Sequence, residues 1–206
     1  MRLAGISIRA RLLLGAVFVL LAFLIGAGLA VQRAHADSVR AAHFAQLQGT
    51  IYLLLAGAEL DPGGNLVMPV SFAEPRLSLP GSGLYASIVN VAKHQEWQSP
   101  STLGRRLPFE RSLPVGRWHA ATVDGPGGSY LALTYAVNWA GRSAAAPLVL
   151  SVLEDKRQFD REVRVFGRTL WGWLGAAGLL LLASLTVLLQ LVLAPLQRVA
   201  SEIVRI

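Results

Sequence analysis

The chain has 206 residues, a formal net charge of +7 at pH 7 and no cysteine. Without cysteine it can form no disulfide, bind no cysteine-ligated zinc and carry out no thiol chemistry. The mean hydropathy of +0.49 is higher than that of an ordinary soluble domain. The basic residues are scattered along the chain and do not form a cluster, so we expect no nucleic acid partner.

An apolar run near the N-terminus, from Leu12 to Val31, predicts a transmembrane helix. The run holds about twenty residues without a charge, and at about 1.5 Å per residue it matches the hydrocarbon core of a bilayer. Arg2, Arg9 and Arg11 precede it, so residues 1–11 are expected on the cytoplasmic side by the positive-inside rule.

A cleaved signal peptide is the alternative explanation of this run. Ala34-His35-Ala36 resembles the small-residue pattern that signal peptidase cleaves. The apolar run is longer than the central region of a typical signal peptide, however, and Arg33 separates it from that pattern. We therefore expect the run to stay as a membrane anchor, and loss of an N-terminal tag would show cleavage.

A second apolar run, from Thr169 to Leu193, predicts a second transmembrane helix. Trp171 and Trp173 at its start are typical of the interfacial belt of a membrane span. Thr186 and Gln190 lie one turn apart, and a buried amide prefers a partner helix to lipid. These two residues are predicted to mark a face turned away from lipid and to take part in signal relay.

In the first run, small residues recur every four positions, at Ala22, Gly26 and Ala30. This spacing lets two helices approach closely, but small residues are also common in membrane helices generally, which is the slightly favoured explanation. With residues 1–11 inside the cell and two spans, residues 32–168 are predicted to lie outside and residues 194–206 inside.

The segment 32–168 is long enough for one compact domain. A helix is expected to continue from the first span through Gln32 to Ala58, because apolar residues recur there at spacings of three and four. Asp61-Pro62-Gly63-Gly64 is expected to end this helix. The apolar stripe consists of Phe44, Leu47, Ile51, Leu54, Leu55 and Ala58.

The next part of the domain is predicted to be mostly irregular. Asn65 to Phe72 is a short extended candidate, and Pro75 to Gly83 reads as a loop. Leu84 to Lys93 fits either a helix or a strand, and Pro100 to Pro114 reads as another loop.

Beyond Pro114 the apolar period changes to two, which predicts β-strands at Arg117–Val123, Tyr130–Trp139 and Pro147–Leu153. Residues 124–128, Asp-Gly-Pro-Gly-Gly, predict a turn, and short links favour an antiparallel sheet. Glu154 to Arg168 returns to a helical pattern that leads into the second span. The predicted fold class is α+β: two transmembrane helices flank a domain with a central antiparallel sheet and a long N-terminal helix.

Residues 194–206 have the pattern of a short amphipathic helix after the second span. Leu196, Val199, Ile203 and Ile206 follow Pro195 at heptad spacing, and the pattern stops in mid-repeat. The sequence thus predicts a fragment of a longer protein, with Pro195 at the point where a signal passes on. A helix lying on the membrane surface is the alternative.

These features resemble the N-terminal half of a PhoQ-like two-component sensor histidine kinase. Residues 194–199, Ala-Pro-Leu-Gln-Arg-Val, look like the start of a HAMP linker, with its proline just inside the membrane. Residues 75–78 followed by 81–86, Pro-Arg-Leu-Ser and Gly-Ser-Gly-Leu-Tyr-Ala, resemble a segment of PhoQ-like sensors. The resemblance covers the organisation of the whole chain.

The resemblance implies a periplasmic PAS-like (PDC-type) sensor between two spans of the bacterial inner membrane. It further implies a homodimer that signals through HAMP to a histidine kinase domain, which uses ATP and Mg²⁺ and phosphorylates a response regulator. This chain holds neither the kinase motifs nor, by expectation, a catalytic residue or a cofactor of its own. A stand-alone two-span envelope protein that binds or assembles a partner is the alternative function.

The domain offers few candidate binding residues. Arg105, Arg106 and Arg111 are candidates for binding an anionic ligand, with a solvated loop as the alternative. The four histidines have no metal-ligand spacing and are expected to be solvated, although histidine can sense pH near neutrality. Ser82 lacks the context of a nucleophile, and Gly81 and Gly83 beside it are expected to set a turn.

A metal site is not predicted either, whereas the PhoQ-like family uses an acidic membrane-facing surface for divalent cations. Residues 32–168 hold 14 Lys and Arg against 11 Asp and Glu. The densest acidic positions, residues 154–155 and 160–162, alternate with basic residues that are expected to pair with them along a helix.

Overall fold

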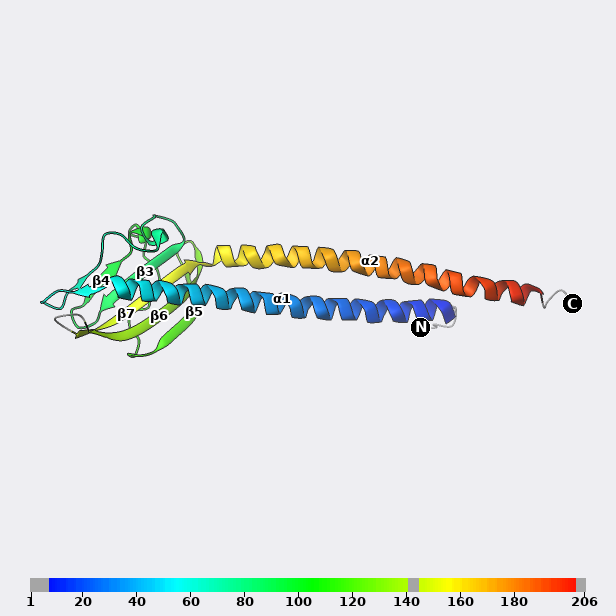
Figure 1. Ribbon diagram of the computed structural model, residues 1–206, viewed down its shortest axis with the longest axis horizontal. Coiled ribbons are helices and arrows are strands. Elements are labelled where there is room, and N and C mark those ends of the chain that lie inside the picture. The colour runs from blue at the N-terminus through cyan, green and yellow to red at the C-terminus, as the bar shows by residue number, and fades with distance from the viewer. Residues whose placement is uncertain (1–7, 141–144, 203–206) are drawn as a thin grey trace. The chain divides into compact units, whose positions relative to one another are not determined.

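The computed structural model describes residues 8–140 and 145–202, and its chain divides into two compact units (Figure 1). One unit, here called the helix pair, is built from the chain up to Ala36 and from Val163 onward. The other, here called the sheet unit, comprises Asp37–Glu162.

Two long helices supply the helix pair. They are α1 (Ile8–Gly57) and α2 (Lys156–Glu202), and each also contributes residues to the sheet unit. By length and composition both are apolar enough to cross a membrane, over Leu14–Gly57 and Lys156–Leu188. The prediction of two long apolar helices is therefore confirmed.

The sheet unit is built on five antiparallel strands, which confirms the α+β class and the central antiparallel sheet. The order across the sheet is β4-β3-β7-β6-β5. The strands are β3 (Leu84–Asn90), β4 (Gln95–Gln98), β5 (Trp118–Gly125), β6 (Gly128–Ala140) and β7 (Ala145–Asp155).

The three strands predicted from the period of two correspond to β5, β6 and β7. The predicted turn closes the β5–β6 hairpin, in which Gly125 lies opposite Gly128. Leu84–Lys93, for which helix and strand were equally possible, contains strand β3. Strand β4 was not predicted, because it is short and only Trp97 among its four residues is apolar, so it shows no alternating pattern.

Helix α1 ends at Gly57, before the predicted stop signal. Strand β1 (Glu59–Leu60) pairs with strand β2 (Leu66–Val67). Of the segment Asn65–Phe72, which was predicted to be extended, only the two residues of β2 form a strand. Asp61 closes the turn between them by accepting hydrogen bonds from the side chain and the backbone N–H of Asn65, at 2.9 and 2.8 Å. These hydrogen bonds hold the pKa of Asp61 below its usual value.

The helix predicted from Glu154 starts two residues later. Glu154 and Asp155 belong to strand β7, and α2 begins at Lys156. The charges of residues 154–162 suggested one helical face, but Glu154 lies opposite Leu84 and Leu131 in the two neighbouring strands. The prediction for Glu154 is therefore wrong.

The core of the sheet unit lies on both faces of the sheet. The predicted stripe of α1 is confirmed on one face: Leu47, Ile51 and Leu54 are at most 1% exposed. A second cluster of buried side chains lies on the opposite face, and its strand residues alternate along each strand with those that face α1. Its members are Tyr85, Leu107, Phe109, Tyr130, Ala132 and Leu153.

Candidate functional site

A buried cluster of charged side chains lies where α1 packs against β7, within the sheet unit. The Nδ1 atom of His43 on α1 lies 2.7 Å from Oε2 of Glu154. The other carboxylate oxygen of Glu154, Oε1, accepts a hydrogen bond of 3.0 Å from Nη1 of Arg76. We call His43, Arg76 and Glu154 the ionic cluster.

The buried carboxylate of Glu154 requires these partners. Glu154 is 1% exposed, because it occupies the penultimate position of a central strand with neighbours on both sides. A buried carboxylate is costly unless hydrogen bonds and opposite charge compensate it. Arg76 and His43 supply that compensation from two other elements.

Helix α2 reaches the same cluster at its first turns. The Nε2 atom of His43 lies 3.6 Å from Oε2 of Glu162, whose side chain is 45% exposed. The ring of Phe159 meets the His43 ring edge to face, with centroids 5.9 Å apart. His43 thus lies between one buried and one exposed carboxylate, and it links α1 to both β7 and the start of α2.

Arg76 is held by a short turn. It lies in the 3₁₀ helix η1 (Pro75–Leu77), where Glu74 caps the turn by accepting a hydrogen bond from the Arg76 N–H. The Ser82 hydroxyl donates to the Arg76 carbonyl at 2.6 Å. Gly81 and Gly83 have φ of +71° and +85°, which confirms that they set the turn beside Ser82.

His43 contacts strand β7 through Glu154 and the start of α2 through Glu162 and Phe159. A displacement of the His43 ring changes the contacts of α1 with β7 and with α2 together. The ionic cluster can therefore couple the packing of these elements to a perturbation of any one of them.

The cluster corrects the prediction that all four histidines are solvated. His43 is buried, at 7% exposure, whereas His94 and His119 are exposed. His35, in the helix pair, stacks on Phe166 with ring centroids 3.7 Å apart. The sequence did hold a signal for His43: it lies one turn before Leu47 on the buried stripe of α1.

The acidic residues between positions 154 and 162 follow the prediction only in part. Lys156 and Asp160 form the expected pair along the helix, at 3.7 Å. Arg157 pairs with Asp155. Burial raises the pKa of Asp155, but hydrogen bonds from the side chain and the backbone N–H of Arg157 lower it by more, so it lies below its usual value. Glu154 instead pairs with residues far away in the sequence, for which sequence spacing gives no signal.

The three arginines proposed as ligand contacts are exposed and have separate surroundings. Arg105 donates to the Tyr85 hydroxyl at 3.3 Å. Arg111 forms two hydrogen bonds with Glu96, of 3.0 and 3.2 Å. Arg106 is exposed on the same loop. The structure gives no joint anion site for them, and ligand binding by Arg105, Arg106 and Arg111 stays a prediction.

The Arg111–Glu96 pair allows a test of stability against pH. Burial raises the pKa of Glu96, but hydrogen bonds from Arg111, Gln98 and Ser87 lower it by more, so it lies below its usual value. A depressed carboxyl pKa stabilises the fold above the unfolded value of about 4.3, and the gain is lost as pH falls through the folded pKa.

We expect Arg111→Ala to lower the free energy of unfolding at neutral pH by less than about 1 kcal/mol, because the arginine side chain is 55% exposed. The difference from the wild type should vanish in acid, where Glu96 is protonated. Thermal unfolding of the full chain in detergent, followed by near-ultraviolet circular dichroism, measures both values. A difference that grows in acid would contradict this account.

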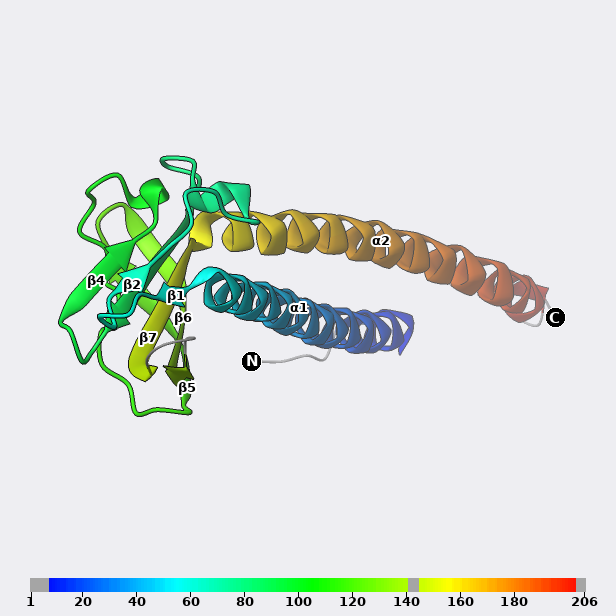
Figure 2. The ribbon, with the colours of Figure 1, turned by 60° about the vertical axis from the view of Figure 1, so that its left-hand side comes forward.

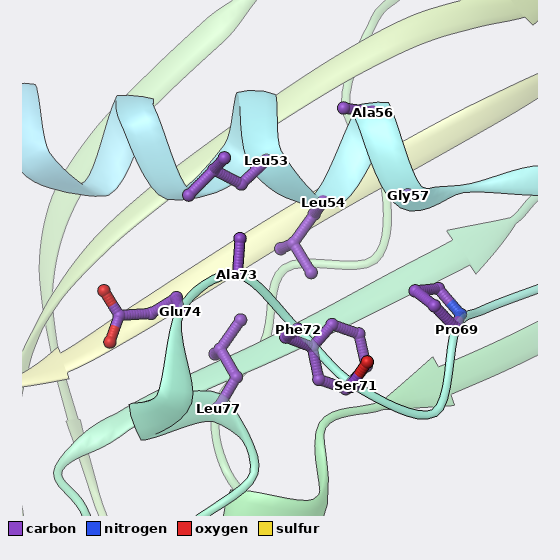
Figure 3. A pocket seen from close by; sticks show the side chains of 10 residues that line it. All are labelled: Leu53, Leu54, Ala56, Gly57, Pro69, Ser71, Phe72, Ala73, Glu74 and Leu77. Atoms are coloured by element: carbon purple, nitrogen blue, oxygen red, sulfur yellow. The ribbon is translucent and has the colours of Figure 1, made fainter.

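A small apolar cavity lies beside the turn that carries Arg76 (Figure 3). Its volume is about 230 Å³, and Leu54 of α1 and Leu77 of η1 form its buried floor. Phe72 and Pro69 from the loop before η1 close its sides. An apolar group in this cavity would contact both α1 and η1, which hold His43 and Arg76.

In the helix pair, α1 and α2 lie side by side (Figure 2). Gly28 is buried, and a Cβ atom added to it would lie 2.8 Å from both Leu174 and Trp171. A Cβ atom added to Gly178 would lie 3.0 Å from Leu24. The two helices therefore meet through glycines, which allow a close approach.

The small residues singled out in the sequence do not form this contact. Ala22, Gly26 and Ala30 are exposed, and nothing lies within 4 Å of a Cβ atom added to Gly26. Regular spacing in one helix does not reveal which face meets its neighbour, so the sequence missed Gly28.

Two of the predicted relay residues are exposed on α2. They are Thr186, whose hydroxyl donates to the Leu182 carbonyl of its own helix at 2.8 Å, and Gln190. The backbone of α2 remains helical at Pro195. A role of Thr186, Gln190 and Pro195 in relay, and a partner helix for the first two, stay predictions.

Within the described part of the chain, no three histidine or acidic side chains are grouped so that they could hold a metal ion. Comparison with protein-family models, with curated proteins and with solved structures finds no match to this chain.

Proposed function

We propose that this chain is the sensor and membrane input module of a two-component sensor histidine kinase of the PhoQ-like type. In this proposal the sheet unit receives a stimulus outside the inner membrane of a bacterium. The helix pair relays it through the second span and a HAMP linker to a kinase domain that follows Ile206.

The observation that carries the proposal is the ionic cluster. His43 lies on α1, and Glu154 lies two residues before α2. These are the same two helices that supply both apolar segments. A stimulus that changes the contacts of His43 with Glu154 or Glu162 thus acts on the helices that are proposed to cross the membrane.

The fold supports the proposal at a coarser level. A five-stranded antiparallel sheet with a long N-terminal helix packed on one face is compatible with a PAS-like or PDC-type sensor domain. The apolar cavity between Leu54 and Leu77 offers a place where a small apolar stimulus could displace the turn that holds Arg76.

The proposed partners follow from this role. The module acts as a homodimer in the bacterial inner membrane, with the sheet unit in the periplasm. A response regulator receives the phosphoryl group from the kinase domain, where ATP and Mg²⁺ bind. The second candidate is a stand-alone two-span envelope protein that binds or assembles a partner, which the two long apolar helices also fit.

The gene sequence after the codon for Ile206 separates the two functions. An in-frame HAMP linker and kinase domain support the sensor. A stop codon at that point supports the stand-alone membrane protein and overturns the proposed kinase input.

Cysteine crosslinking tests the proposed dimer, and the chain has no native cysteine to interfere. Single cysteines placed in turn along residues 12–31 are expected to crosslink between two copies with a helical period of about 3.6 residues. Crosslinked dimer is measured on a non-reducing gel of native membranes. Yields without that periodicity would count against a dimer formed through the first span.

A further inference from the structure

An open groove lies between the two helices of the helix pair. It has a volume of about 530 Å³ and is lined by Gln32 of α1 and by Arg164, Gly167, Arg168 and Trp171 of α2. Arg164 and Arg168 are four residues apart and therefore lie on the same face of the helix. The groove thus combines two guanidinium groups with an amide and an indole.

Within the part of the helix pair whose side chains the structure describes, the two arginines have no acidic partner. Residues 1–36 and 163–201 contain neither aspartate nor glutamate. Among the described residues, neither Arg164 nor Arg168 forms an ion pair with a carboxylate. Their positive charges therefore remain available to an anion from outside the chain.

A neutral hydrogen bond fixes the opposite wall of the groove. The Trp171 indole N–H donates to Oε1 of Gln32 at 2.9 Å, which holds the Gln32 amide in place. The Nε2 group of Gln32 remains as a donor beside Gly167, where an added Cβ atom would lie only 3.3 Å from it. Guanidinium groups and amide N–H donors are the groups that recognise phosphate oxygens.

Membrane topology does not account for these arginines. The positive-inside rule explains Arg2, Arg9 and Arg11, which precede the first apolar segment. Arg164 and Arg168 directly precede the uncharged run Thr169–Leu193, so in a two-span chain they lie at the opposite side of the bilayer. Trp171 is 37% exposed just after them, as is typical of a side chain at headgroup depth.

We propose that this groove binds the phosphate of an anionic lipid headgroup in the leaflet next to the sheet unit. Arg164 and Arg168 hold the phosphate oxygens, the Gln32 amide donates a further hydrogen bond, and Trp171 lies against the glycerol and upper acyl region. The inference rests on the proposed membrane placement of the two helices but not on a kinase function.

The test uses the full chain in detergent, titrated with phosphatidylglycerol or with phosphatidylcholine of the same acyl chains. Native mass spectrometry counts the lipids that each chain retains. We expect phosphatidylglycerol to bind at least about fivefold more tightly, because its net charge is negative, whereas the choline cation of phosphatidylcholine is repelled by the two arginines. Equal retention of the two lipids would overturn the proposal.

Variants then locate the binding. The double variant Arg164→Gln, Arg168→Gln is expected to lose the preference for phosphatidylglycerol, and Gln32→Leu to weaken it about two- to threefold. Arg33→Gln is the matched control, because Arg33 is exposed beside Gln32 and does not line the groove. A double variant that retains the preference, or a control that loses it as well, would overturn the assignment.

Soluble anions distinguish the source of the phosphate. Inorganic phosphate and glycerol 3-phosphate, added in excess, are expected to leave lipid retention unchanged, because they lack the contacts with Trp171. Full displacement of the lipid by either anion would overturn a lipid site in favour of a site for free phosphate. Far-ultraviolet circular dichroism confirms that each variant keeps its helices.

Because retention is measured on this chain alone, a failed role in kinase signalling would leave the lipid result intact. Conversely, loss of lipid binding would leave the ionic cluster and its proposed role untouched.

Discussion

Replacing Glu154 by leucine is expected to lower the free energy of unfolding of the sheet unit by about 3 kcal/mol. The substitution removes the partner of two groups, the Arg76 guanidinium at 3.0 Å and the His43 ring at 2.7 Å. The His43 side chain is 8% exposed and Arg76 29%, so water replaces the lost contacts only in part. The cost comes from the groups left without a partner and not from the leucine itself.

Two further variants test this explanation. The double variant His43→Leu with Glu154→Leu also removes the unpartnered imidazole of His43. It is therefore expected to regain part of the stability that Glu154→Leu loses. Glu110→Leu is the matched control: Glu110 also pairs with a histidine, His119, at 2.6 Å, but the two side chains are 36% and 52% exposed. Its cost is expected to stay below about 1 kcal/mol.

Chemical unfolding of the full chain in detergent, followed by near-ultraviolet circular dichroism, gives these free energies. Equal losses for Glu154→Leu and Glu110→Leu would show that burial of the cluster does not matter. Such a result would also remove the coupling on which the proposed sensor role depends.

Features set by short stretches of the chain could be predicted from the sequence, whereas contacts between distant segments could not. Periodicity predicted α1, whose stripe at Leu47, Ile51 and Leu54 is local, and the long strands β6 and β7. Local pattern cannot show which distant segments meet. Arg76 and Glu154 are 78 residues apart, and only the pairing of β3 with β7 brings η1 to the end of β7.

The errors have the same origin. Glu154 was placed on a helix because charged residues follow it closely, and nothing nearby shows that it ends a central strand. His43 was expected to be solvated because the four histidines lack metal-ligand spacing, yet the buried stripe of α1 continues through it. Buried charges depend on long-range partners, so a sequence read in short windows assigns them to the surface.

Gly28→Leu is expected to separate α1 from α2, because even a Cβ atom at this position would lie 2.8 Å from Leu174 and Trp171. Overpacking of this kind costs about 1 to 3 kcal/mol, which corresponds to at least about a fivefold shift in the population of the close pair. In the proposed relay, such a shift would hold the output in one state.

A pair of cysteines reports the separation directly. Leu24→Cys with Gly178→Cys places two thiols where the helices touch, since an added Cβ atom at Gly178 would lie 3.0 Å from Leu24. A short bifunctional thiol reagent should join them readily, and at least about fivefold more slowly when Gly28→Leu is added.

Gly26→Leu in the same cysteine background is the matched control. It adds the same side chain two residues away, where nothing lies within 4 Å of an added Cβ atom, and it should leave the crosslinking rate unchanged. If Gly26→Leu slowed the reaction as much as Gly28→Leu, bulk anywhere on α1 would be responsible. If neither slowed it, the helices would not depend on Gly28 for their approach, and displacement at this contact could not carry the signal.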